Sequence, residues 1–216
     1  MKKILKLLLL ALLVVTLYET YAVLTARSKT PEIFNTLLKS EKIKLQLTDL
    51  SKEQISALLT IEDPNFYAHN GFDFQTAGAG VTSITQAMVK YLYFDHFEAG
   101  FKKIEQTLIA WLAVTPLVSK DEQLTVFINT AYMGKVKGEQ IRGFADASQA
   151  YYDKEFSTLT HDEYLSLVAL VLAPNTFQIL KHKERNDERV ERIKKVLNHE
   201  SQPTGLSDML FGQVIK

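Results

Sequence analysis

Cysteine is absent from this 216-residue chain, tryptophan occurs once, and the acidic and basic side chains balance to a formal net charge of zero. Without cysteine the chain has no disulfides, thiolate metal ligands or cysteine nucleophile, and such a composition suits an oxidising or extracytoplasmic compartment. A balanced charge lacks the basic footprint of a nucleic-acid-binding domain, so we predict no nucleic-acid partner. The length is sufficient for one domain with its own hydrophobic core.

Charged residues are also scarce near the N-terminus, where the basic start MKK is followed by an apolar run that ends near Leu24. This pattern fits either a cleaved signal peptide or an uncleaved membrane anchor. No small-x-small cleavage site precedes Arg27, which favours the anchor. Because the basic end should stay in the cytoplasm, we predict a single-pass protein of the inner (cytoplasmic) membrane. Its domain would lie on the extracytoplasmic, periplasmic side.

Helical periodicity dominates the rest of the chain, and we predict a mainly α fold. Capping boxes at 51–54 (SKEQ), 119–122 (SKDE) and 160–163 (THDE) each predict the start of a helix. Further helices are expected at 83–94, 101–114, 142–152 and 187–198. Apolar and polar side chains alternate over residues 41–48 (EKIKLQLT), which predicts a strand.

The composition changes along the chain predict four parts. They are an anchor or signal at 1–25, a polar stalk at 26–40, one domain at 41–199 and a loosely held tail at 200–216. Within the domain, residues 74–80 (FQTAGAG) have no period and predict a loop, while Gly134 and Gly138 should bracket a tight connection.

Groups suited to chemistry concentrate in residues 61–73, IEDPNFYAHNGFD, where two carboxylates end an apolar helical segment. A carboxylate in such a place can take part in acid–base catalysis. Taken alone, however, an acidic pair at a helix end is more often simply exposed to water. No second histidine lies at ligand spacing from His69, so we predict a structural histidine and no metal site built from protein ligands alone.

Three blocks resemble motifs of the peptidoglycan glycosyltransferases, glycosyltransferase family 51. The first motif of that family reads roughly E-D-x-x-F-x-x-H-x-G and is matched by Glu62, Asp63, Phe66, His69 and Gly71. The second, G-x-S-T-I-T-Q-Q, resembles GVTSITQ at 80–86, with Thr82 and Ser83 in swapped order. The fourth, Y-L-N-x-x-Y-x-G, resembles FINTAYMG at 127–134. This resemblance covers about residues 52–197 and implies a single lysozyme-like helical glycosyltransferase domain.

The resemblance implies an enzyme that polymerises lipid II with inversion at the anomeric carbon. Glu62 would be the general base that takes the proton of the acceptor 4-hydroxyl. Departure of the lipid diphosphate builds negative charge, which cations or a divalent Mg²⁺ or Mn²⁺ ion would stabilise. The substrate-binding residues implied by the resemblance are Asp63, Phe66, His69, Thr82, Ser83, Thr85, Gln86, Lys90, Lys102, Lys103 and Asn129. Lipid II, lipid-linked glycan, the membrane and other cell-wall synthases would be the partners.

The chain departs from the family in two places. The third motif usually reads R-K-x-x-E, and aligning FKKIEQTLIA (101–110) on its helix puts Gln106 at the acidic position. Shifting by one residue puts Glu105 there but breaks the helix register, so we favour Gln106. The loop between the first two motifs is also short, with about half the usual residues, and lacks the usual arginine.

These departures leave two alternatives to an active polymerase. The first is a catalytically impaired relative that binds lipid II or a cell-wall synthesis partner. The second, weaker alternative is a lysozyme-like glycan hydrolase, since the family's fold resembles the helical lobe of lysozyme and both have a central glutamate.

Overall fold

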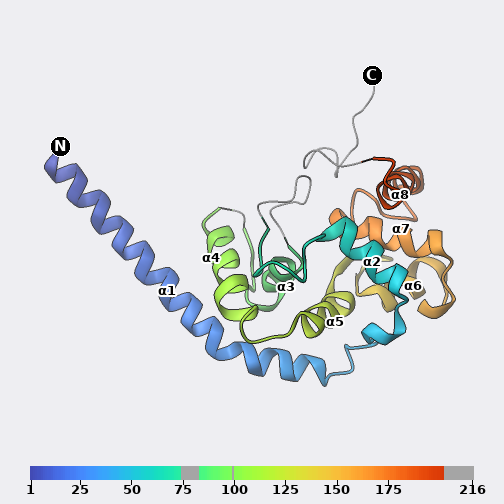
Figure 1. Cartoon of the computed structure of the whole chain (residues 1–216), viewed down its shortest axis with the longest axis horizontal. Helices are drawn as coiled ribbons and strands as arrows, with labels where there is room; N and C mark the ends of the chain where they lie inside the picture. Colours follow the sequence, from blue (N-terminus) through green and yellow to red (C-terminus); the bar gives the residue numbers. More distant parts are fainter. Residues whose placement is uncertain (74–82, 99, 202–216) are drawn as a thin grey trace.

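A computed structural model of the chain describes residues 1–73, 83–98 and 100–201, and the predicted loop 74–80, Thr82 and nearly all of the tail lie outside these ranges. The described part is mainly α, as predicted (Figure 1). Its α-helices are α1 (Lys2–Leu38), α2 (Lys52–Glu62), α3 (Ile84–Leu92), α4 (Phe101–Ile109), α5 (Lys120–Thr130), α6 (Phe144–Tyr152), α7 (His161–Leu172) and α8 (Lys183–Leu197). Shorter elements are the 3₁₀ turns η1 (Leu47–Asp49) and η3 (Phe156–Thr158), the π-turn η2 (Ala110–Val114), and the strands β1 (Tyr132–Val136) and β2 (Glu139–Arg142).

All three predicted capping boxes form, at the starts of α2, α5 and α7. At the first of them the Ser51 hydroxyl accepts the Gln54 amide, while the Gln54 side chain accepts the Ser51 amide. Such boxes satisfy backbone donors that the first helical turn leaves without partners. These helix starts are therefore fixed by side chains only three residues apart in the sequence.

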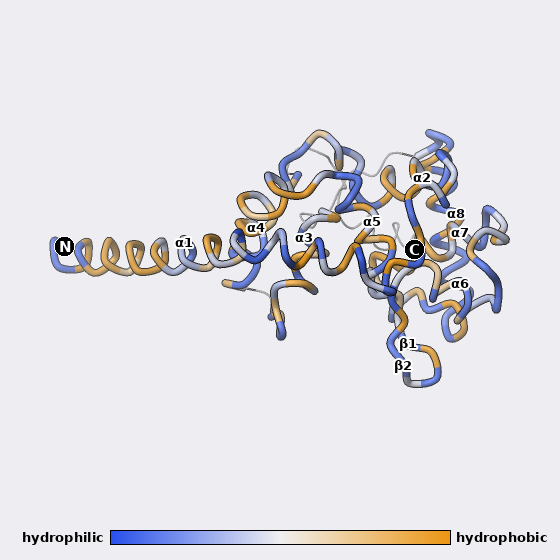
Figure 2. Tube along the Cα trace, turned by 90° about the horizontal axis from the view of Figure 1, so that it is seen from below, coloured by the Kyte–Doolittle hydropathy of each residue, from blue (hydrophilic) through white to orange (hydrophobic). Residues whose placement is uncertain are grey.

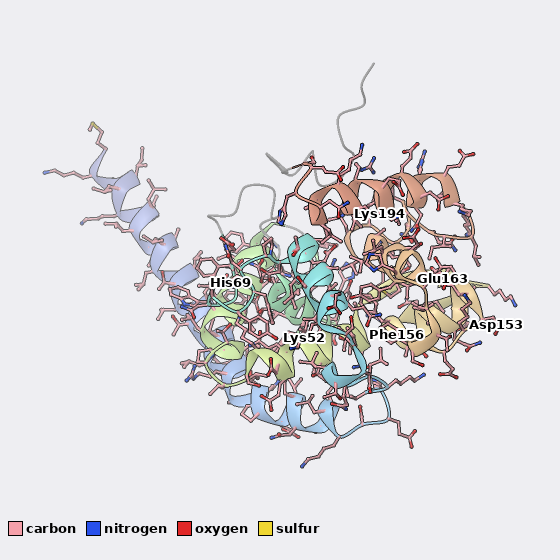
Figure 3. All side chains as sticks on the ribbon, turned by 45° about the vertical axis from the view of Figure 1, so that its right-hand side comes forward. Lys52, His69, Asp153, Phe156, Glu163 and Lys194 are labelled. Carbon is pink, nitrogen blue, oxygen red and sulfur yellow. The ribbon has the colours of Figure 1, made fainter. Side chains whose placement is uncertain are left out.

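Helices α5 and α7 contribute many of the buried side chains of the core, and both lie within the body of the domain (Figure 1). On α7 the side chains of Leu165, Leu167 and Leu170 are fully buried, and on α5 so are those of Leu124 and Ile128. Helix α8 packs on α7 (Figure 3), and the Lys194 ammonium lies 2.9 Å from the Asp162 carboxylate across that contact. Helix α2, which ends at Glu62, contacts α7 and so lies against this core.

Helix α1 has two parts that differ in their surroundings. Its N-terminal half is apolar and projects away from the body (Figure 2), and the helix is long and apolar enough to cross a membrane. Its C-terminal half covers the segment predicted as a stalk, and there Ala26, Thr30 and Phe34 are buried at helical spacing. Pro31 lies inside the helix, where it removes one backbone hydrogen bond, and α1 bends as it reaches the body (Figure 1).

The strand predicted at 41–48 is wrong. The only sheet among the described residues is the hairpin of β1 and β2, which turns through Lys137 and Gly138, both at positive φ. Residues 43–46 have no neighbouring strand; instead the Asn129 side chain accepts the backbone N–H groups of Lys44 and Leu45. A side chain thus takes the place of the strand that a sheet would need.

Candidate active site

Helix α2 ends at Glu62 because of the proline that follows. Pro64 disfavours helical backbone angles at the residue before it, and Asp63 has φ −162° and ψ 74°, outside the helical region. Glu62 is therefore the last helical residue, while the Asp63 side chain turns into the protein and is only 2 % exposed. The adjacent side chains of Glu62 and Asp63 therefore lie in different surroundings.

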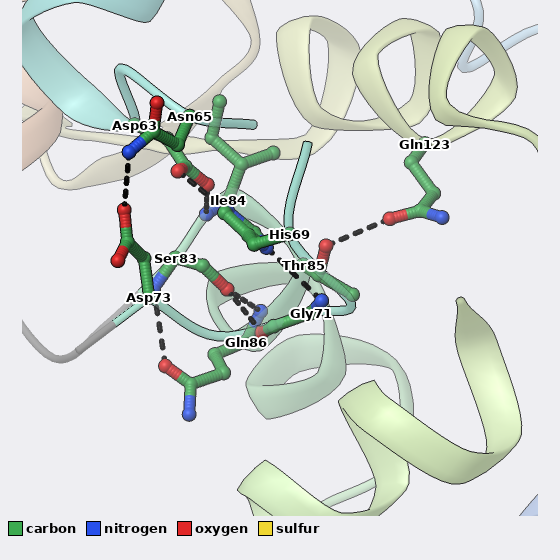
Figure 4. Close-up of polar contacts among 10 residues, drawn as sticks. All are labelled: Asp63, Asn65, His69, Gly71, Asp73, Ser83, Ile84, Thr85, Gln86 and Gln123. Carbon is green, nitrogen blue, oxygen red and sulfur yellow. Dashed lines mark hydrogen bonds and ion pairs between the residues drawn. The ribbon is translucent and has the colours of Figure 1, made fainter. Parts of the chain in front are cut away.

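Asp63, the residue after Glu62, anchors a network of hydrogen bonds (Figure 4). Its Oδ1 lies 2.7 Å from His69 Nε2, and its Oδ2 accepts the Ile84 amide at 2.9 Å, at the start of α3. His69 Nδ1 accepts the Gly71 amide, so the proton of a neutral ring is on Nε2 and is donated to Asp63. Both Asp63 oxygens are thus engaged, and His69 links the Asp63 carboxylate to the Gly71 backbone.

Residues of the second predicted motif extend this hydrogen-bond network. Ser83 and Gln86 form a capping box on α3, and the Ser83 hydroxyl also donates to the Gly71 carbonyl at 2.5 Å. The Gln86 amide donates to Thr107 on α4, and Thr85 donates to Gln123 on α5. Ser83, Thr85 and Gln86 are all buried and take part in this hydrogen-bond network. Their contact with substrate stays a prediction.

Two further residues predicted to bind substrate are also internal. Phe66 is 1 % exposed and belongs to the core. Asn129 accepts from two backbone amides and donates to the Leu45 and Thr125 carbonyls, which uses the full capacity of its amide. Both residues are architectural. The sequence alone could not distinguish this role from substrate contact.

Gly71 lets the first motif approach η2 closely. Its φ is +95°, and a Cβ built there would lie 2.8 Å from the Ala110 carbonyl carbon and 2.9 Å from Thr115 Oγ1. The predicted helix 101–114 changes here from α to the wider π form, in which the Thr115 amide bonds the Ala110 carbonyl. Such π-turns are rare and occur frequently at functional sites.

The carboxyl group of Glu62 has an unusual electrostatic environment because it is buried. The residue is partly exposed, but its Oε1 is buried and has no hydrogen-bond partner among the described residues. Burial raises the pKa of Glu62 to about 7; Asp63 adds to this rise, and the positive charge of Arg189 opposes it. A carboxyl group that titrates near neutral pH is suited to exchange protons with a substrate.

Two cations behind this site were missed in the sequence. Arg189 on α8 is 2 % exposed, and its guanidinium lies 5.3 Å from the Phe177 ring centroid. Lys120 Nζ lies 4.4 Å over the Phe66 ring, and burial lowers the Lys120 pKa to about 8 while Asp63 opposes that change. Lys120 lies within a capping box and Arg189 in a charge-rich helix, and the sequence pattern singles out neither of them.

A second group of cations gathers where α3 faces α4. The Lys103 pKa is lowered, first by burial and then by the positive charge of Lys90. Lys90 Nζ lies 5.3 Å from the Phe97 ring centroid. Lys102 points elsewhere and donates to the His96 carbonyl. Of the three lysines predicted to bind substrate, Lys90 and Lys103 are therefore the pair brought together, and two neighbouring like charges favour an anion between them.

A family model described as "Transglycosylase" matches residues 30–198. The chain belongs to this family, the peptidoglycan glycosyltransferases. It is 28% identical over 167 residues to penicillin-binding protein 1F of Bacillus subtilis, covering 71% of this chain and 23% of that protein. It is 29% identical over 164 residues to penicillin-binding protein 1A of Vibrio cholerae, covering 70% and 19%. For penicillin-binding protein 1B of Buchnera aphidicola, the identity is 31% over 182 residues, covering 69% and 24%.

The matched regions make up only about a quarter or less of these relatives, as the coverages of 23%, 19% and 24% show. The transglycosylase match includes the Glu62 site, the lysine pair and the last part of α1, from residue 30 to Leu38. It leaves out the projecting half of α1.

The two residues predicted as candidates for the acidic position of the third motif, Gln106 and Glu105, lie in different surroundings. Gln106 is 1 % exposed, and its Nε2 donates to the Gln86 carbonyl at 2.5 Å, so it faces α3. Glu105 faces α1 instead, where its carboxylate lies 3.5 Å from the Tyr18 hydroxyl. The two candidates for the second acidic residue thus lie on different faces of α4, Gln106 toward α3 and Glu105 toward α1.

The described residues do not fit a metal ion held by protein ligands. No three His, Asp or Glu side chains among them converge as a metal site requires, and the two oxygens of Asp63 already have partners. A divalent cation carried by the donor diphosphate stays a prediction, and no step proposed below depends on it.

Proposed function

We propose that this chain is a peptidoglycan glycosyltransferase that polymerises lipid II, with Glu62 as general base. The observation that carries the proposal is the buried, unpartnered Glu62 Oε1 with a pKa raised to about 7. An alcohol is a poor nucleophile at neutral pH, so its proton has to be removed as the new C–O bond forms. Glu62 would accept the proton of the acceptor 4-hydroxyl, and the oxygen would attack the anomeric carbon opposite the leaving diphosphate. That attack inverts the anomeric carbon.

The ammonium groups of Lys90 and Lys103 would stabilise the negative charge that develops on the departing lipid diphosphate. Preplaced cations stabilise charge that develops in a transition state, and most strongly where water is partly excluded. Lys103 is half-buried, and burial contributes to its lowered pKa. An anion beside it would favour the protonated ammonium. Lys102 is not part of this group because it is bound to the His96 carbonyl.

Helix α1 would hold the domain at the surface where lipid II is found. Its projecting half would span the inner membrane once, with the domain on the periplasmic side. Other cell-wall synthases would be partners at the same surface.

Lipid II polymerisation by the purified full-length chain tests the proposal. General base catalysis typically contributes about 10²–10⁴-fold in rate, so Glu62→Gln should lower polymerisation by at least about 100-fold. Glu53→Gln is the matched control, because Glu53 lies on the same helix and is exposed. Full activity in Glu62→Gln would exclude Glu62 as the base. Release of soluble fragments from purified cell wall would indicate the hydrolase instead.

A second candidate is a catalytically impaired relative that binds lipid II or a synthesis partner. The observation that favours it is the buried Gln106 amide at the position where the family has a glutamate. An amide forms hydrogen bonds but carries no negative charge. Lipid II binding by the wild-type chain with no glycan product, under conditions where a related enzyme polymerises, would establish this candidate.

A further inference from the structure

A groove of about 570 Å³ runs between α1 and the segment formed by α4 and η2. Its lining residues on α1 run from Val15 to Arg27, the part of α1 that approaches the body of the domain (Figure 1). Its walls are mostly aliphatic, with Val15, Val23 and Leu24 on one side and Leu108 and Leu112 on the other. The volume is within the range of about 300–1,000 Å³ that is usual for sites that hold small ligands.

An acidic side chain is buried in the wall of this groove. Glu19 is 6 % exposed, and neither of its carboxylate oxygens has a hydrogen-bond partner among the described residues. Glu105 lies close enough to Glu19 for their negative charges to repel each other. The neighbouring hydroxyls do not relieve this, because Thr16 and Thr20 donate to carbonyls of their own helix. Glu19, in the wall of the groove, and Glu105, near it, thus form no ion pair with a cation of the described residues.

We propose that this groove binds a membrane phospholipid with a primary-ammonium headgroup, whose ammonium lies between Glu19 and Glu105. The inference rests on the proposed membrane placement of α1, since the groove then opens near the outer headgroups. A primary ammonium has three N–H donors, which fit unpartnered carboxylate oxygens. One acyl chain of the same lipid would fill the aliphatic part of the groove. The anchor and the domain would thus share a bound lipid.

Charge complementarity favours this lipid over other lipids and over the substrate. An anionic headgroup would be repelled by the two carboxylates, and a trimethylammonium headgroup has no N–H to donate. The only cation that lines the groove, Arg27, already donates to the Leu112 carbonyl. A diphosphate would find better partners at Lys90 and Lys103, on the other side of α4 from Glu105.

Retention of lipid by the full-length chain provides the test. The protein would be released from nanodiscs that contain equal amounts of phosphatidylethanolamine, phosphatidylcholine and phosphatidylglycerol with identical acyl chains, and bound lipid counted by native mass spectrometry. Loss of a charge-assisted hydrogen bond corresponds to about tenfold or more in affinity, so phosphatidylethanolamine should be enriched about tenfold. Glu19→Gln should remove the enrichment. Glu32→Gln, which changes an exposed residue of the same helix, should keep it.

Several results would overturn the inference. They are equal retention of the three lipids, a preference for phosphatidylglycerol, equal binding of phosphatidylcholine, and an enrichment that survives in Glu19→Gln. Retention of a leucine-rich transmembrane peptide with one lysine, in place of lipid, would make the groove a docking site for a protein helix instead. Lipid II polymerisation is measured on the same samples. Lost lipid preference with intact polymerisation contradicts only this inference, whereas the reverse result contradicts only the proposed function.

Discussion

The Glu62 carboxyl group is held in a place that disfavours its charged form. Its pKa in the folded protein is about 7, against the usual value near 4.5. The native state therefore binds more protons than the unfolded state between these values, and stability falls as pH rises through this window. A shift of this size corresponds to about 3 kcal/mol at most.

Replacing this carboxyl should accordingly stabilise the protein at high pH only. Glu62→Gln should gain up to about 3 kcal/mol relative to wild type at pH 8 compared with pH 5, because the neutral amide does not titrate. Denaturant unfolding at the two pH values measures the difference. Glu53→Gln should show no such gain, since Glu53 is exposed. An equal effect of Glu62→Gln at both pH values would mean that the buried carboxyl does not titrate in this range.

The positive charge of Arg189 lowers the pH above which Glu62 can act as a base. Its charge lowers the pKa of Glu62, opposing burial. Arg189→Met should therefore raise that pKa and move the acidic limb of the polymerisation–pH profile to higher pH, with a larger loss of rate at pH 6 than at pH 8. Arg185→Met is the control, because Arg185 is on the same helix and exposed. A uniform loss at all pH values would indicate a structural role only.

At the scale of elements, the sequence predicted what depends on neighbours in the chain. The boxes at Ser51, Ser119 and Thr160 were predictable because both partners lie within three residues. The strand at 41–48 was wrong because a strand needs a partner, and here the partner is the Asn129 side chain. Alternating apolar residues do not reveal such a distant contact.

In the candidate site, too, the residues close together in the sequence could be predicted, and those from distant helices could not. Glu62, Asp63 and His69 could be placed together because they share one short segment and a family motif. Lys120 and Arg189 reach that segment from α5 and α8. Their roles depend on burial, which the charge pattern of an amphipathic helix conceals. A motif shows that Ser83, Thr85 and Gln86 belong together, but it does not show that they are buried and bonded to Gly71, Gln123 and Thr107.

The contact between the first motif and η2 is tested by comparing two glycines. Both Gly71 and Gly100 have positive φ, but a Cβ would clash with Ala110 only at Gly71, while at Gly100 nothing lies within 4 Å. Gly100→Ala should cost about 1 kcal/mol from backbone strain, and Gly71→Ala about 1–3 kcal/mol more from overpacking. Equal costs in thermal unfolding would mean that the approach of Gly71 to η2 is not tight.

At the scale of the whole molecule, α1 belongs to two environments. The first half is almost entirely exposed and apolar, which suits a lipid bilayer. The second half is part of the domain: Phe34 is 3 % exposed, and the Thr30 hydroxyl lies 2.7 Å from that of Tyr93. Residues 26–38, which lie in the predicted stalk, therefore belong to the same continuous helix as the anchor and carry side chains buried in the domain.

Two truncations test how much these buried side chains stabilise the domain. A chain that starts at residue 26 keeps Thr30 and Phe34 and should unfold close to the full-length chain in the same detergent. A chain that starts at residue 40 loses both, and removal of a buried phenylalanine alone typically costs about 3–5 kcal/mol. Its thermal midpoint should fall well below that of the longer chain. Phe34→Ala in the full-length chain separates packing from length, since it removes the same buried ring while keeping α1 intact. Equal midpoints for the two truncations would show that residues 26–39 do not stabilise the domain, and α1 would then be an anchor and stalk only.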